Sequence, residues 1–157
     1  MGECDQGTKL FASFLPGGGT IEELNTVRKH ISHLKGGGLA KALYPATVIG
    51  LVFSDVPGGD IAAVASGPTC PDTSTNHEAQ AIIEKYNLGS FNLTETPKDP
   101  KYFAKVHNFT IVSNVTALSA MQKTAAELTY RTELVSATQY ATATDTATQL
   151  TQKTQPD

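Results

Sequence analysis

The chain has 157 residues and a mass of 16.6 kDa, which suffices for one domain with a core and is too short for two. Apolar residues make up 39% of it and charged residues 17%, a balance that excludes a chain disordered throughout. The 12 Lys and Arg against 15 Asp and Glu give a net charge of -3, which argues against binding to nucleic acids.

The sequence indicates neither a membrane segment nor a site built on cysteines. No stretch approaches the roughly 20 apolar residues of a membrane helix, and residues 1–5 are too polar for a secretory signal peptide. We therefore expect a cytoplasmic protein without membrane contact, and mitochondrial import stays open. Cys4 and Cys70 lack a second pair with which to form a zinc site or a disulfide framework, so both are expected to be plain thiols.

The first helix is expected from Thr20 to about Leu34. Thr20 and Glu23 have the spacing of a capping box, in which each side chain accepts a hydrogen bond from the other residue's amide. One apolar stripe follows at steps of three and four residues: Ile21, Leu24, Val27, Ile31 and Leu34. A polar stripe beside it, suited to lining a cleft, holds Asn25, Arg28, Ser32 and Lys35. His30 and His33 lie away from the polar stripe and are expected at the surface.

A buried strand is expected next, over residues 47–53, because this apolar run shows no alternation and so suits a strand covered on both faces. The following loop, residues 54–60, carries Asp55 and Asp60. A loop at the carboxyl end of a strand is a common place for chemistry in α/β sheets. We expect an extended piece over residues 61–65 after it.

The rest of the chain predicts alternating helices and strands. Thr75 and Glu78 form a second capping box that opens a helix with a stop at Gly89. Residues 90–105 are expected to be a surface connection with at most a short helix. The remaining elements are a strand over 108–113, a helix over 115–128, a strand over 131–136 and a final helix within 138–157. This succession of strand, helix and strand favours parallel pairing of the strands.

Three glycine-containing segments carry candidate chemistry. Residues 35–38, Lys-Gly-Gly-Gly, suit an anion-binding loop, although a plain helix stop is favoured. In residues 54–60, Asp55 and Asp60 suit magnesium binding or proton acceptance. The equal alternative is that Asp55 caps a turn and Asp60 is solvated. Residues 66–69, Ser-Gly-Pro-Thr, suit an oxyanion site, although an ordinary turn is favoured. Neither a P-loop nor a dinucleotide-binding glycine pattern is present.

Arg28 stands at the border of the apolar stripe on the first helix. A guanidinium there can grip a carboxylate or a phosphate with two parallel hydrogen bonds. A structural salt bridge is the equal alternative.

Placed in order, four segments are similar to the glycerate 2-kinase family, and in particular to its animal members. These are residues 19–32, residues 35–40 with the following Tyr-Pro-Ala at 44–46, residues 54–56 (Ser-Asp-Val) and residues 65–69 (Ala-Ser-Gly-Pro-Thr). The resemblance runs from about residue 10 to residue 136. It implies an α/β protein with a three-layer α/β/α sandwich, here incomplete, and transfer of phosphate from ATP, with Mg2+, to the 2-hydroxyl of D-glycerate to give 2-phosphoglycerate.

The resemblance also implies roles for individual residues. Arg28 and Lys35 would hold the substrate carboxylate or phosphate, and Asp55 would act on magnesium or on the hydroxyl proton. Further contacts to substrate or phosphate would come from Gly36, Gly37, Ser54, Asp60, Ser66, Gly67 and Thr69.

Two departures from the family pattern shape what we expect of activity. The loop after Ser-Asp-Val normally continues with Gly-Asp, whereas here Gly58 and Gly59 precede Asp60. Residues 1–157 are also expected to be a single domain that corresponds to the middle of the family's N-terminal α/β domain, without its C-terminal domain. We therefore expect weak or no turnover, and self-association through exposed sheet edges.

Two other function classes compete with the kinase. The first is a catalytically inactive anion-binding or interaction module derived from a glycerate kinase. The second is an oxidoreductase acting on hydroxypyruvate, against which the missing nicotinamide-binding pattern argues.

Overall fold

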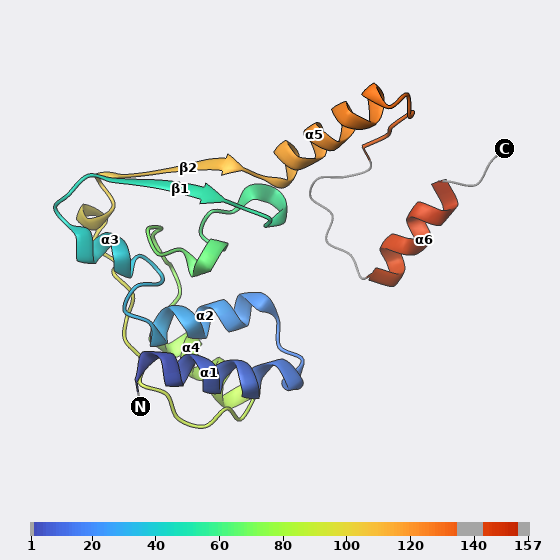
Figure 1. Cartoon of the computed structure of the whole chain (residues 1–157). Helices are drawn as coiled ribbons and strands as arrows, with labels where there is room; N and C mark the ends of the chain where they lie inside the picture. Colours follow the sequence, from blue (N-terminus) through green and yellow to red (C-terminus); the bar gives the residue numbers. More distant parts are fainter. Residues whose placement is uncertain (1, 135–142, 154–157) are drawn as a thin grey trace.

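A computed structural model describes residues 2–134 and 143–153 of the chain and shows helices and strands in alternation (Figure 1). Its helices are α1 (Glu3–Phe14), α2 (Ile21–Ile31), α3 (Gly38–Leu43), α4 (Asn76–Lys85), α5 (Asn114–Glu127) and α6 (Ala143–Lys153). Its strands are β1 (Val48–Phe53) and β2 (Val106–Val112). Short 3-10 turns occur at Leu15–Gly17, Pro57–Gly59, Val64–Ser66 and Pro100–Tyr102.

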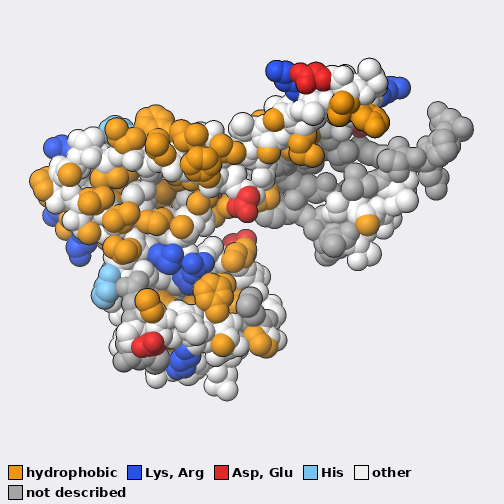
Figure 2. Space-filling model, in the orientation of Figure 1, with side chains coloured by type: hydrophobic (Ala, Val, Ile, Leu, Met, Phe, Trp, Pro, Cys, Tyr) orange, Lys and Arg blue, Asp and Glu red, His pale blue; other side chains and the backbone are white. Residues whose placement is uncertain are grey.

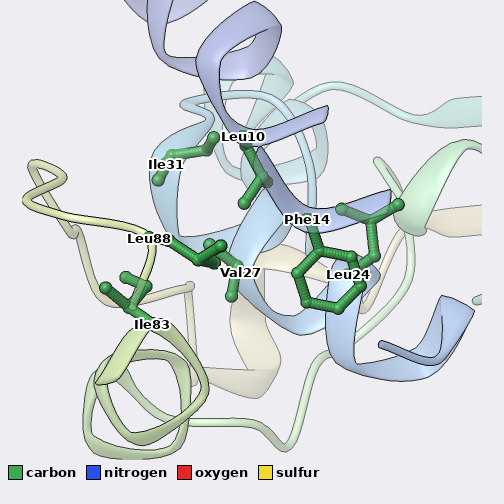
Figure 3. Packing of buried hydrophobic residues seen from close by; sticks show 7 residues of the cluster. All are labelled: Leu10, Phe14, Leu24, Val27, Ile31, Ile83 and Leu88. Atoms are coloured by element: carbon green, nitrogen blue, oxygen red, sulfur yellow. The ribbon is translucent and has the colours of Figure 1, made fainter. Parts of the chain in front are cut away.

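The buried core lies among helices α1, α2 and α4, on the opposite side of the molecule from the sheet (Figures 1 and 3). Its side chains are apolar and come from all three helices and the turn after α4: Leu10, Phe14, Leu24, Val27, Ile31, Ile83 and Leu88. The ring of Phe14 meets that of Tyr86 edge to face, with centroids 4.9 Å apart. Helix α1, which the sequence patterns did not predict, therefore supplies part of the core.

Both predicted capping boxes are confirmed. The amide of Glu23 donates to Thr20 Oγ1, and the amide of Thr20 donates to Glu23 Oε2. Thr75 and Glu78 repeat this pattern at the start of α4. Because each box satisfies amides that the first turn of a helix leaves unpaired, the sequence places both helix starts correctly.

Helix α2 ends at Ile31, earlier than the expected Leu34. Ser32 leaves the helical conformation, and its Oγ accepts hydrogen bonds from the amides of Leu34 and Lys35. These bonds form a turn that competes with a further helical turn. Leu34 is exposed in consequence. Ile21, in the first turn of α2, is also exposed, so the buried stripe consists of Leu24, Val27 and Ile31.

Strands β1 and β2 pair in parallel, with Leu51 opposite Phe109 and an irregularity between Val52 and Phe53. The described part of the chain is thus of the α/β class with a small parallel sheet. The expected coverage of β1 on both faces is wrong for the described residues, because Ile49, Leu51 and Phe53 are all exposed.

Two further expectations for the chain around the sheet are wrong. Residues 61–65 form turns that lead into the 3-10 turn Val64–Ser66 instead of an extended piece. Residues 131–134 form no strand, and the rest of the expected strand over 131–136 lies outside the described residues.

The connection over residues 90–105 is only partly at the surface. Phe91 and Leu93 pack against the core, and Thr96 is buried. The amide of Thr94 donates to the carbonyl of His30 over 2.7 Å, which ties this connection to α2. The one helical turn in it is Pro100–Tyr102. No helix within residues 2–134 and 143–153 is long and apolar enough to cross a membrane.

Candidate functional site

Two loops far apart in the sequence are joined by backbone hydrogen bonds. The amide of Gly36 donates to the carbonyl of Ser66 over 2.9 Å, and the amide of Gly37 donates to that of Gly67 over 2.8 Å. The amide of Leu39 then donates to the carbonyl of Pro68 over 3.1 Å. The structure therefore brings together the Lys-Gly-Gly-Gly and Ser-Gly-Pro-Thr segments that the sequence singled out.

The glycines of this junction allow a close approach of the two loops. Gly37 has a φ of 88°, and a Cβ atom there would lie 2.7 Å from the Phe103 ring and 3.0 Å from the carbonyl oxygen of Cys70. Only glycine fits such a position without displacing its neighbours. The amides of Gly36 and Gly37 join the two loops, while the amide of Gly67 donates to the carbonyl of Val64 within its own turn. The anion-binding role predicted for Gly36, Gly37 and Gly67 stays a prediction.

Lys35 and Arg28 both lie beside this junction. Lys35 Nζ donates to the carbonyl of Ala65 over 2.9 Å, which places the ammonium group against the Ala65–Ser66 turn. Arg28 Nη1 donates to Asn25 Oδ1 over 3.2 Å, and its guanidinium lies over the ring of Phe11, 5.1 Å from the centroid. Burial lowers the pKa of Arg28. Of the polar stripe expected on this helix, Asn25 and Arg28 lie on α2, whereas Ser32 and Lys35 follow its end.

Ser66 is fully buried and belongs to the same cluster. Its hydroxyl donates to Asn25 Oδ1 over 2.9 Å, so Asn25 accepts from Ser66 and Arg28 at once. Sequence reasoning placed Asn25 on the polar stripe but did not select it as a site residue. Its position one helical turn before Arg28 could have indicated that the two side chains are in contact.

Lys and Arg side chains gather where the helical part approaches the sheet, with acidic side chains beside them (Figure 2). Next to β1 there is a mostly apolar cavity of about 270 Å³, whose lining includes Leu39, Leu51, Ala65, Pro68, Cys70 and Asn108. An apolar lining with a few polar groups is typical of small-molecule sites.

The acidic loop follows β1 on the sheet side. Ser54 is buried, and its Oγ accepts from the amide of Val56 over 3.2 Å. Asp55 is exposed, and its carbonyl accepts from Asn114 Nδ2 over 2.9 Å at the start of α5. A cavity of about 440 Å³ lies here, at the carboxyl ends of both strands, as the sequence predicts for chemistry in an α/β sheet.

Asp60 and Thr69 have local partners. Asp60 is exposed, and its Oδ1 accepts from the amide of Ala62 over 2.9 Å, so it caps a turn. Thr69 Oγ1 donates to Asn108 Oδ1 over 2.8 Å and so ties the Ser-Gly-Pro-Thr loop to β2. Asn108 is a second polar residue of this region that sequence reasoning did not select. Within the described ranges, no group of three or more His, Cys, Asp or Glu side chains is arranged to hold a metal.

Cys70 borders the apolar cavity as a free thiol. Burial raises its pKa, the nearby Asp60 raises it further, and Lys29 opposes both effects. The thiol is therefore held in its protonated form, as expected for a residue without reactive character.

The surface position expected for His30 is wrong, because its side chain is fully buried. Its Nδ1 lies 2.8 Å from the side-chain amide of Asn76 and 3.1 Å from the carbonyl oxygen of Thr94, and its Nε2 lies 3.2 Å from Ser74 Oγ. Helix α2 turns this position toward α4 and the connection after it. His30 is a structural residue of the helical part. His33 is exposed, as expected.

These observations define an α/β protein with a parallel sheet and a polar junction between two loops. Residues 3–98 match a family model described as a domain of unknown function, DUF4147. The match covers more than half of the chain. The chain therefore belongs to this family.

Curated proteins that are similar to this chain include glycerate kinases and a putative hydroxypyruvate reductase. A D-glycerate 2-kinase of Thermotoga maritima is 46% identical over 96 residues, 57% of this chain and 23% of that protein. A glycerate kinase of Macaca fascicularis is 40% identical over 108 residues, 62% of this chain and 27% of that protein. A putative hydroxypyruvate reductase of Agrobacterium vitis is 51% identical over 76 residues, 48% of this chain and 17% of that protein.

A solved structure extends the likeness to the fold. The crystal structure of a glycerate kinase from Thermotoga maritima aligns with a TM-score of 0.71 and 36% identity. The alignment covers 83% of this chain and 32% of that one. The resemblance to glycerate kinases, animal ones included, is confirmed at the level of family and fold. The chain spans between 17% and 27% of the length of the three relatives.

Proposed function

We propose that this chain carries part of the active site of an ATP-dependent D-glycerate 2-kinase, which converts D-glycerate to 2-phosphoglycerate. One observation supports it above the others: the Lys35 loop and the Ser66 loop form one junction beside Arg28. The similarity to relatives named glycerate kinases adds support. Because the chain spans only part of those relatives, turnover by these residues alone is expected to be weak or absent.

Arg28 and Lys35 are the proposed ligands of negatively charged groups. A guanidinium matches the two oxygens of a carboxylate or phosphate, and an ammonium adds a second positive charge. Both side chains are anchored, Arg28 on Asn25 and Lys35 on the carbonyl of Ala65. Anchored cations lose less conformational entropy on binding than free ones, so they favour one position of the substrate.

Asp55 is the proposed acidic group, and its chemistry leaves two roles open. It would accept the proton of the 2-hydroxyl, or it would hold Mg2+. Nucleotide-bound magnesium is commonly held by one or two carboxylates together with phosphate oxygens and water, and the exposed Asp55 carboxylate fits that mode. Bound Mg2+ would neutralise charge on the phosphate oxygens during transfer. Asp60 is the alternative acid.

In the proposed transfer, the 2-hydroxyl oxygen of D-glycerate bonds to the γ-phosphorus of ATP. The bond from that phosphorus to the bridging oxygen of ADP breaks. The hydroxyl proton passes to Asp55, or to solvent where Asp55 holds the metal. Arg28 and Lys35 would stabilise charge on the transferred group. Contacts that complete the proposed site would come from Gly36, Gly37, Ser54, Asp60, Ser66, Gly67 and Thr69.

The test is ADP release by the purified chain with ATP, Mg2+ and D-glycerate, against a blank without glycerate. We expect at most slow glycerate-dependent release, and Asp55→Asn should lower any such release by about 100-fold or more. Asp99→Asn is the matched control, because it removes the same charge from an exposed acid in the connection after α4. Equal rates for wild type and Asp55→Asn contradict the role of Asp55.

A catalytically inactive anion-binding module is the second candidate. The observation that favours it is the separation of groups: the cations lie on the helical part, and Asp55 lies at the carboxyl end of β1. No ADP release together with calorimetric binding of 2-phosphoglycerate supports this module. The name of the Agrobacterium relative adds a reductase as a rival, for which consumption of NADH with hydroxypyruvate is the direct assay.

A further inference from the structure

The side-chain oxygen of Asn25 is shared by two donors. Arg28 Nη1 donates to it over 3.2 Å from one turn further along α2, and Ser66 Oγ donates to it over 2.9 Å from the opposite loop. An amide oxygen has two lone pairs, so both of its acceptor positions are in use. Asn25 therefore links the cationic side chain of the proposed site to the loop that faces it.

The loop that Asn25 holds has an unusual backbone. Ala65 and Ser66 have φ angles of 52° and 62°, in the left-handed region that non-glycine residues seldom occupy. Such a conformation persists only where surrounding contacts fix it, and it is frequent at functional sites. Here the contacts are the Lys35 ammonium on the Ala65 carbonyl, the Gly36 amide on the Ser66 carbonyl, and Asn25 on the Ser66 hydroxyl.

The guanidinium of Arg28 is held from a second side as well. It lies over the ring of Phe11, 5.1 Å from the centroid, while Asn25 accepts from one of its five N–H donors. An aromatic face and one hydrogen bond together fix the plane of the guanidinium. Four donors remain for a ligand, which is more than a two-pronged grip on an oxyanion requires.

We propose that Asn25 is a positioning residue that orients Arg28 toward an anionic substrate and couples it to the Ser66 loop; this inference rests on the proposed function. The absence of charge on Asn25 is essential to the role. An aspartate at the same position would accept the same two hydrogen bonds, but its negative charge would pair with Arg28 and repel the anion. An amide orients the guanidinium and leaves its full charge for the ligand.

The first measurement concerns the free chain and needs no ligand. Rotation of the Arg28 guanidinium is followed by 15N NMR in wild type and in Asn25→Ala. We expect slow rotation in wild type and faster rotation in Asn25→Ala, because the hydrogen bond to the side-chain oxygen is lost. Equal rotation in the two proteins overturns the inference whatever the function of the chain.

The second measurement is calorimetric binding of 2-phosphoglycerate to wild type, Asn25→Asp and Arg28→Ala, with thermal unfolding as the control for folding. We expect Asn25→Asp to keep the melting temperature and to weaken binding by about tenfold, and Arg28→Ala to bind still more weakly. Wild-type affinity in Asn25→Asp, with binding lost in Arg28→Ala, refutes the inference and leaves the proposed function standing. Unchanged binding in Arg28→Ala refutes both.

Discussion

Lys29 Nζ donates to Asp72 Oδ1 over 2.9 Å, and this ion pair joins α2 to the segment that leads into α4. Asp72 also accepts from the hydroxyls of Ser74 and Thr96. Burial alone would raise the pKa of Asp72, but hydrogen bonds led by that from Lys29 outweigh this effect and lower the pKa. The carboxylate thus connects three segments in its charged form.

Replacing Asp72 is therefore expected to destabilise the fold. Asp72→Ala leaves Lys29 and two hydroxyls without their acceptor, and we expect the free energy of unfolding to fall by about 2–3 kcal/mol. Urea denaturation followed by circular dichroism measures this change. Asp60→Ala, which removes an exposed carboxylate, is the control and should change stability far less. Equal stabilities for the two variants would show that the Asp72 network contributes nothing.

Stability is expected to fall at acid pH through Glu23. Hydrogen bonds to its carboxylate lower the pKa of Glu23 from 4.5 to about 2. They come from the Lys85 ammonium, the Thr20 amide and the Tyr86 hydroxyl. A group with a depressed pKa in the folded state stabilises it above the unfolded pKa, and this contribution is lost as pH falls through the folded pKa. The loss should therefore occur between pH 4.5 and about 2.

Melting temperatures measured at steps through this pH range test the assignment. Glu23→Gln removes the titrating group and should flatten the dependence, with lower stability at neutral pH. Glu84→Gln, on an exposed position of α4, is the matched control and should keep the wild-type profile. A Glu23→Gln profile that parallels the wild type at every pH contradicts the assignment.

Gly19 is expected to tolerate no side chain. A Cβ atom at this position would lie 2.1 Å from Cζ of the buried Phe14, so the ring would have to move. We expect Gly19→Ala to destabilise the chain by about 1–3 kcal/mol. Gly7→Ala is the control, because a Cβ there meets nothing within 4 Å and alanine favours the helix interior.

A double-mutant cycle identifies the clash as the cause. Phe14→Leu removes the ring, so adding Gly19→Ala to it should cost much less than Gly19→Ala costs in the wild type. Thermal or urea unfolding of the four proteins gives the coupling energy. If the two substitutions add without coupling, contact with Phe14 is not the reason for glycine at this position.

Self-association is expected to involve the sheet. Ile49, Leu51 and Phe53 expose 67%, 64% and 68% of their surface on a strand that pairs along one edge only with the described part of the chain. Apolar strands with open edges tend to pair with other chains. Sedimentation velocity should show mass rising with concentration, and Leu51→Lys should reduce this effect. Ile21→Lys, at an exposed apolar position of α2, should not; a wild-type chain that stays monomeric throughout contradicts the expectation.

Local patterns in the sequence suffice for several elements. Thr20, Glu23, Thr75 and Glu78 fix the helix starts because capping acts within one turn. The continuous apolar run predicts β1. Parallel pairing was expected between residues 108–113 and 131–136, whereas the parallel pair within the described residues is β1 with β2. The structure brings the segments around Lys35 and Ser66, both selected from the sequence, next to each other. Their role in binding substrate or phosphate stays a prediction.

Expectations that depend on distant residues were the ones that failed. Burial of His30 requires Asn76, Ser74 and Thr94 to converge on it, and no pattern near His30 reveals them. The early end of α2 is the exception, because it rests on local bonds from the amides of Leu34 and Lys35 to the Ser32 hydroxyl. The place of Asn25 in the candidate site depends on its hydrogen bond with Ser66, which lies 41 residues further along the chain. Such contacts are properties of the folded chain.

The bonds from Gly36 and Gly37 to Ser66 and Gly67 also bear on hydrogen exchange. Triple-glycine loops commonly exchange their amide protons with solvent at once, since nothing protects them. Here both amides are buried donors to a loop that α2 itself holds through Asn25. Exchange at these positions requires the two loops to separate, so their protons report the opening of the junction and not the free motion of either loop.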